Sequence, residues 1–153
     1  MDSVNSAPAA VDFVPMDLDA VLALWDRPID QRADPAADFR QFYADPVPVN
    51  GIPTNAEDLV ARVRSLQAAF ADRRTELVHR IETADRLVIG FYMYVRHVGP
   101  YNTPLGRVAP TGKQLRIRVN DILTVHDGKI TNIWVMSDDV DLMCQLGQLP
   151  TSV

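Results

Sequence analysis

The stretch that decides the fold reads Lys113-Gln-Leu-Arg-Ile-Arg-Val-Asn-Asp-Ile-Leu-Thr-Val125, and its apolar and polar side chains alternate with the period of two that predicts a β-strand. The Asp-Gly pair at 127–128 predicts a tight turn, and Lys129-Ile-Thr-Asn-Ile-Trp-Val135 predicts the returning strand of a hairpin. A strand that is apolar on one face is expected to turn that face into a core or a cavity.

One charged residue interrupts the apolar face of this strand. A carboxylate there costs several kcal/mol unless it is paired, hydrogen-bonded or protonated, so Asp121 needs a physical reason. Either the carboxylate is functional, or a bulge turns it toward backbone amides or toward Arg116 or Arg118. The rest of the face consists of Leu115, Ile117, Val119, Leu123 and Val125.

Length and composition predict one globular domain. The chain has 153 residues, of which 47% are hydrophobic and 23% are charged. The net charge of -5 argues against a nucleic-acid partner, and the single cysteine, Cys144, excludes an internal disulfide. No apolar run is long enough to span a bilayer, and the first residues lack the basic region of a signal peptide. We therefore expect a cytoplasmic protein without a membrane partner.

The order of the periodic segments predicts an α+β fold in which helices cover one face of a curved sheet. We expect a disordered tail over 1–14, one domain over 15–147 and a C-terminal tail over 148–153. A capping box at Thr54-Asn-Ala-Glu57 opens a helix that runs to about Asp72. Further helices are predicted over 16–26, 35–40 and 139–146. A four-stranded antiparallel meander is predicted over 76–82, 87–98 and the hairpin, with a proline-limited edge segment over 42–51.

Two further aspartates have a structural and a functional interpretation. Asp45 shares the face of the edge segment with Tyr43, and it is either a catalytic group or part of an exposed Asp-Pro turn. Asp138 either caps the last helix or reaches the concave side of the sheet. The concave interpretation follows from period-two register with Ile130, Asn132, Trp134 and Met136.

The sequence offers no pattern for a metal or a cofactor. The three histidines, His79, His97 and His126, lack the close spacing of a metal site. There is no phosphate-binding loop, glycine-rich dinucleotide turn or nucleophile elbow. We therefore expect a protein that works without cofactor or metal.

The last third of the chain resembles the SnoaL-like polyketide cyclases of the nuclear transport factor 2 and ketosteroid isomerase superfamily. The likeness runs from about Leu18 to Gly147, and it is carried by Arg96-His-Val-Gly99, Pro110-Thr-Gly-Lys113, the stretch 121–134, Asp138 and Gln145-Leu-Gly147. It implies a cone, in which a curved mixed sheet wraps around a pocket and three helices close it. It also implies a homodimer formed through the sheet.

The resemblance assigns expected roles to individual residues. Many SnoaL-like cyclases place an acid/base aspartate directly after the strand tryptophan, where this chain has Val135. Asp45-Pro46 resembles the Asp-Pro of ketosteroid isomerase, whose aspartate is the proton-shuttling base. Asp121 matches the position of that enzyme's protonated oxyanion-hole aspartate. The expected catalytic pair is therefore Asp45 as base and Asp121 as hydrogen-bond donor to a carbonyl oxygen.

The predicted activity is cofactor-independent cyclisation or isomerisation of a hydrophobic polyketide-like intermediate, by an aldol-type or a pericyclic closure. Alternatives are an epoxide hydrolase or cyclase of polyether type and a non-catalytic small-molecule binding module. Tyr92, Tyr94 and Arg96 either line the pocket or face a dimer partner, and the loop 99–112 is a candidate gate. The apolar wall is expected to comprise Trp25, Phe70, Met93, Trp134 and Met136.

Overall fold

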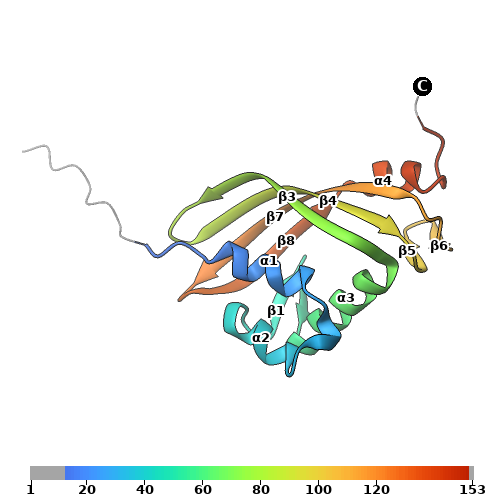
Figure 1. Cartoon of the computed structure of the whole chain (residues 1–153). Coiled ribbons are helices and arrows are strands. Elements are labelled where there is room, and N and C mark those ends of the chain that lie inside the picture. Colours follow the sequence, from blue (N-terminus) through green and yellow to red (C-terminus); the bar gives the residue numbers. More distant parts are fainter. Residues whose placement is uncertain (1–12, 152–153) are drawn as a thin grey trace, which may run out of the picture.

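The computed structural model describes residues 13–151, which form a curved sheet with helices packed against its concave side (Figure 1). The tail expected over 1–14 lies almost wholly outside the described residues. The elements in chain order are α1 (Leu18–Asp26), the 3-10 turn η1 (Ile29–Gln31), α2 (Pro35–Phe42), β1 (Val47–Val49), β2 (Ile52–Thr54), α3 (Ala56–Ala69), β3 (Phe70–Glu82), β4 (Arg86–His97), β5 (Tyr101–Thr103), β6 (Gly106–Val108), β7 (Gln114–His126), β8 (Lys129–Ser137) and α4 (Asp139–Gln145).

The main sheet has six strands in the order β2-β1-β8-β7-β4-β3 and is not closed into a barrel. Strands β3, β4, β7 and β8 pair antiparallel, which confirms the predicted meander. Strand β1 comes from the predicted edge segment and pairs parallel to β8, with Val49 opposite Ile133. The loop predicted over 99–112 contains the small hairpin β5–β6, which lies apart from the main sheet.

Helix α3 begins one residue later than the predicted capping box and ends earlier. Asn55 is the N-cap, and its side chain and that of Asp58 exchange hydrogen bonds with each other's backbone N–H groups. The predicted extension to Asp72 is wrong, because Phe70 already pairs with His97 of β4. Pairing with β4 takes the place of the predicted last helical turn. Strand β3 therefore starts six residues before the predicted strand.

The strand register shifts at three points, two in β3 and one in β8, and the first shift in β3 and the shift in β8 concern residues that were predicted to line the cavity or that line it. In β3 the pairing moves from Ala71 opposite Arg96 to Arg74 opposite Tyr94, and Asp72 between them has a φ of 54°. In β8 the pairing with β7 skips Thr131. An extra residue reverses which face each later side chain occupies. These bulges decide which residues reach the concave face.

The core fills the space between the concave face and the helices. Phe39 of α2, Leu59 of α3 and Leu87 of β4 are buried there, together with Ile130 of β8. A second cluster under α4 is built around Phe70. Within residues 13–151 no helix is long and apolar enough to cross a membrane.

Candidate active site

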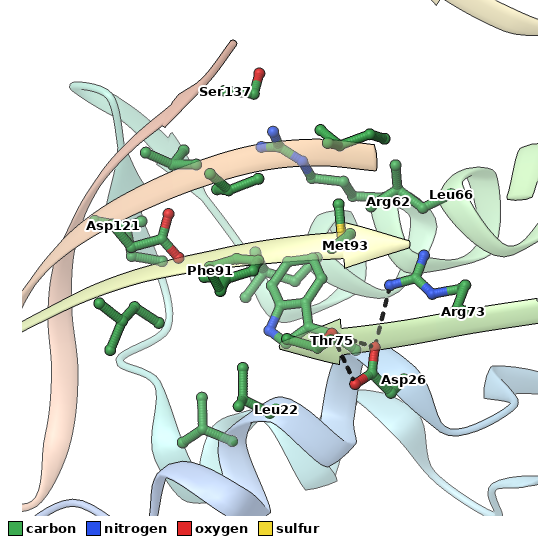
Figure 2. Close-up of a pocket in the computed structure, with 18 of the residues that line it drawn as sticks. Leu22, Asp26, Arg62, Leu66, Arg73, Thr75, Phe91, Met93, Asp121 and Ser137 are labelled. Carbon is green, nitrogen blue, oxygen red and sulfur yellow. Dashed lines mark hydrogen bonds and ion pairs between the residues drawn. The ribbon is translucent and has the colours of Figure 1, made fainter. Parts of the chain in front are cut away.

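A cavity of about 180 Å³ lies between the concave face of the sheet and helices α1 and α3 (Figure 2). Its wall is largely aliphatic and aromatic, and it draws on every long strand of the sheet. The apolar lining residues are Val21, Leu22, Trp25, Val49, Leu59, Leu66, Phe70, Ile89, Phe91, Met93, Ile117, Val119, Leu123, Ile133, Val135 and Leu142. Such a wall suits a hydrophobic ligand, and the few polar side chains among it would orient that ligand.

Asp121 lies in the middle of the sheet, opposite Ile89 of β4 and Val135 of β8, and its carboxylate lines the cavity. Its Oδ1 atom is buried and has no hydrogen-bond partner among the described residues. Burial raises the pKa of the Asp121 carboxyl to about 7, although the positive charge of Arg62 opposes the shift. This carboxyl group can therefore both accept and donate a proton near neutral pH.

Tyr43 lines the same cavity at the end of α2. The indole Nε1–H of Trp25 donates to the Tyr43 hydroxyl oxygen at 3.0 Å. Burial raises the pKa of the Tyr43 hydroxyl, and the negative charge of Asp121 raises it further. The phenol consequently stays protonated at neutral pH and has one O–H donor for a ligand oxygen.

A second polar group of the cavity combines Asp26, Arg73 and Thr75. Nη2 of Arg73 lies 3.4 Å from Oδ1 of Asp26, and the Thr75 hydroxyl donates to Oδ2 of Asp26 at 3.2 Å. Figure 2 shows this group on the opposite side of the cavity from Asp121, with Phe91 and Met93 between them. The cavity therefore carries two separate polar regions.

Six of the eight residues predicted to bind substrate do not line the cavity, and four of them are polar. Tyr92, Tyr94 and Arg96 occupy the face of β4 opposite to Met93, where Arg74 and Arg116 stack over the two tyrosine rings and Asp72 accepts from Arg96. Asp138 caps α4 by accepting from the backbone N–H of Asp141, and it also pairs with Arg118. These two interactions lower the pKa of the Asp138 carboxyl.

Trp134 and Met136 are also placed differently from the prediction. Both side chains point away from the cavity and are 56% and 72% exposed. Strict alternation from Ile130 would have turned them inward, but the bulge at Thr131 reverses the phase of β8. Val135 lines the cavity instead.

The structure separates Asp45 from Asp121. The carboxylate of Asp45 accepts from Nε of Arg40 at 2.7 Å and from the backbone N–H of Ala56 at 3.2 Å, and it is not among the cavity-lining residues. A bend at Asp45-Pro46 interrupts the edge segment, so the face predicted from Tyr43 does not continue through Asp45.

Of the residues predicted to form the apolar wall, Trp25, Phe70 and Met93 do line the cavity. The sequence interpretation missed Tyr43, although it identified the face on which Tyr43 lies. It also missed Asp26, Arg62 and Arg73. The cavity-lining position of Arg73 depends on the bulge at Asp72, for which the alternation pattern gives no signal.

The curved open sheet, with helices enclosing a cavity on its concave side, defines a known class of α+β fold. The sequence model that describes the SnoaL-like polyketide cyclase family matches residues 19–146 of this chain. The chain therefore belongs to this family. The comparison with curated protein sequences found no match.

Solved structures support the fold assignment. The chain is similar to TsrD from Streptomyces laurentii, with 21% identity, a TM-score of 0.71, and coverage of 86% of this chain and 92% of TsrD. It is also similar to a SnoaL-like polyketide cyclase from Agrobacterium tumefaciens, with 20% identity, a TM-score of 0.68, and coverage of 88% and 100%. At these identities the likeness establishes the fold, and the chemistry must be argued from the cavity itself.

Proposed function

We propose that this protein is a cofactor-independent polyketide cyclase in which Asp121 transfers the proton during an aldol-type ring closure. The observation that carries the proposal is the carboxyl group of Asp121, which lines an apolar cavity and whose buried Oδ1 has no hydrogen-bond partner among the described residues. An unpaired buried carboxyl group is costly for the fold, and groups with such perturbed pKa values cluster at catalytic sites.

The proton and electron balance of the reaction needs no cofactor. The Asp121 carboxylate removes a proton from a carbon next to a carbonyl group of the substrate, and the Tyr43 hydroxyl donates a hydrogen bond to the resulting enolate oxygen. The enolate carbon attacks a second carbonyl carbon and closes the ring. The alkoxide formed there takes back the proton from Asp121, so the enzyme returns to its starting state.

The surroundings of the two polar groups favour this chemistry. The wall of the cavity is mainly aliphatic and aromatic, so a ligand that fills the cavity would place the hydrogen bond from Tyr43 in a medium of low dielectric constant. A carboxyl group with a pKa of about 7 is close to the optimum for taking and returning a proton at neutral pH. The apolar wall and the family both favour a hydrophobic polyketide-like substrate.

Deuterium exchange of a model ketone tests the proton-transfer step without the native substrate. The probe is 1-tetralone in D2O, and the rate of exchange at its α-carbon is followed by proton NMR. We expect the wild-type protein to accelerate exchange over buffer, and Asp121→Asn to lower the protein-catalysed rate by about 10²-fold or more. Wild-type activity in Asp121→Asn would contradict the proposal.

Two further aspartate variants complete this experiment. Asp127→Asn is the matched control, because Asp127 lies exposed in the turn between β7 and β8, and asparagine accepts its positive φ. It should exchange as fast as the wild type. Asp45→Asn tests the alternative in which Asp45 supplies the base. An equally large loss in that variant would contradict the assignment of proton transfer to Asp121 alone.

We also propose that the protein forms a homodimer through the convex face of the sheet. This face exposes Ile122 of β7 together with Trp134 and Met136 of β8, and Ile122 pairs directly with Trp134. Large apolar side chains that gather on a sheet face and remain exposed are typical of an interaction surface. A second copy would cover them and leave the cavity on the concave side open to substrate.

A further inference from the structure

Arg73 is a charged residue that lines the cavity and has no role in the proposed proton transfer. The left-handed conformation of Asp72 inserts one extra residue into β3, so Arg73 turns inward beside Phe70 and Thr75. The side chain of Arg73 is only 9% exposed. Its flanking arginine, Arg74, keeps the outward direction and lies over the ring of Tyr94.

Several N–H donors of the Arg73 guanidinium group have no hydrogen-bond partner among the described residues. Its ion pair with Asp26 uses Nη2 at 3.4 Å, and neither Nε nor Nη1 has a hydrogen-bond partner within residues 13–151. Buried donors of a charged group cost free energy when they stay unpaired. Thr75 holds Asp26 in place at 3.2 Å, so the cluster fixes Arg73 and leaves donors of its guanidinium group unused.

The polar region around Arg73 and the one around Asp121 are separated along the strand direction of the sheet. Asp121 pairs with Ile89 and Thr75 pairs with Met93, which places the two polar regions four residues apart along β4. Four residues of a strand span roughly 13 Å, which is longer than the carbon framework of two or three fused six-membered rings, so a ligand that reaches both regions needs such rings extended by a carboxylate or a side chain. Because both regions line the same cavity, a ligand of that length can contact both at once.

The charges around the cavity favour an anionic ligand. Arg62 and Arg73 oppose one carboxylate, Asp26, whenever Asp121 is protonated. A ligand carrying one negative charge would then neutralise the lining. Arginine pairs with carboxylates in a geometry that gives both attraction and orientation.

We infer that Arg73, held by Asp26 and Thr75, is a binding site for a carboxylate group of the ligand, at the side of the cavity remote from Asp121. The preferred ligand is thus a fused-ring or ring-forming acid rather than its ester. The inference deepens the proposed function, because anchoring one end of a polyketide acid in this way would place its other end at Asp121.

Paired probes test the carboxylate site directly. The probes are 2-naphthoic acid and methyl 2-naphthoate, and isothermal titration calorimetry at pH 6 and low salt measures their affinities. We expect the wild-type protein to bind the acid at least tenfold more tightly than the ester. Arg73→Met keeps an unbranched apolar chain similar to the aliphatic stem of arginine and removes the charge, so it should abolish this preference while the ester still binds. Arg73→Lys should retain part of it.

Asp26→Asn is expected to raise the affinity for the acid, whereas Arg73→Met is expected to lower it. The variant keeps an acceptor for Thr75 and removes the negative charge that competes for Arg73, so it should bind the acid several-fold more tightly than the wild type does. A purely structural Arg73–Asp26 pair predicts no change in the acid-to-ester ratio in either variant. That outcome, or equal affinities for acid and ester in the wild type, would overturn the inference, even if Arg73→Met fails to fold.

Failure of the binding site and failure of the proposed function are distinguishable. Asp121→Asn should lose ketone exchange but retain the acid preference, because its amide lies far from Arg73. Exchange that depends on Asp121 in a protein without acid preference would reject the carboxylate site alone. Acid preference in a protein that never exchanges the ketone would reject the proposed chemistry alone.

Discussion

Trp25 donates its indole N–H to the phenolic oxygen of Tyr43 at 3.0 Å, across the cavity-facing contact between α1 and the end of α2. This hydrogen bond occupies one acceptor position of the hydroxyl oxygen and fixes its location. The hydroxyl proton is left to be donated elsewhere. Tyr43 is only 4% exposed, so within the cavity that donor is directed at a ligand rather than at bulk water.

Tyr43→Phe should therefore slow ketone exchange by about 10²-fold, the usual loss when one oxyanion donor is removed. The free energy of unfolding should fall by about 1–3 kcal/mol, because the buried indole N–H of Trp25 loses its acceptor. Exchange kinetics and urea denaturation measure the two effects. Trp25→Phe is the matched variant, and it should slow exchange less because the Tyr43 hydroxyl remains. An unchanged rate in Tyr43→Phe would exclude this tyrosine from catalysis.

Arg62→Gln should raise the pKa of Asp121 above the wild-type value of about 7, because the positive charge of Arg62 opposes the upward shift caused by burial. Carbon-13 NMR of protein labelled at aspartate Cγ measures the titration, and Asp121→Asn assigns the resonance. Arg64→Gln removes an exposed arginine of the same helix, which pairs with Asp30 on the surface, and should leave the titration unchanged. A titration below pH 5 in the wild type would contradict the burial argument.

Asp121→Asn should stabilise the fold at pH 8 but not at pH 4. The folded pKa is raised from 3.8 to about 7, so the folded state binds more protons than the unfolded chain between these values. Stability of the wild type must then fall as pH rises through this window, by up to about 4 kcal/mol for this group. The asparagine variant has no carboxyl group at this position, so its stability does not fall in this way. Urea denaturation at both pH values provides the comparison, and an equal difference at pH 4 and pH 8 would reject the shifted pKa.

Trp134→Glu combined with Met136→Glu should convert the proposed dimer to a monomer without unfolding it. Both side chains are exposed in the single chain, so a charge costs little there, but two copies would bury like charges against each other. Light scattering after gel filtration measures the mass. Leu105→Glu places the same charge in the β5–β6 turn and should have no effect. A monomeric wild-type protein would remove the basis for the dimer.

The four long strands and the helices α1–α4 could be predicted, and so could the placement of Asp121, because alternation along β7 is uninterrupted at that point. Leu115, Ile117, Val119 and Leu123 are all buried on one face, as the period of two requires. Asp121 follows the same phase and reaches the cavity. A residue that breaks a pattern can be located from sequence when its neighbours keep the pattern.

Trp25, Phe70 and Met93 were also predicted correctly, but other parts of the site could not be predicted because single inserted residues decide them. The bulge at Thr131 turns Trp134 out and Val135 in, and the bulge at Asp72 turns Arg73 in. Each bulge arises from pairing with a neighbouring strand, which local periodicity does not report. The bend at Asp45-Pro46 had a similar effect, because it separates Tyr43 from the predicted face of Asp45.

The pH dependence of 1-tetralone exchange tests the central claim most directly, since it joins the titration of Asp121 to its role as a base. The carboxylate is the active form, so the protein-catalysed rate should rise from pH 5, reach half its maximum near pH 7 and level off above pH 8. Asp121→Asn should show only the residual rate across the whole range. A wild-type profile that is flat from pH 5 to pH 8, or one that Asp121→Asn reproduces, would contradict the account.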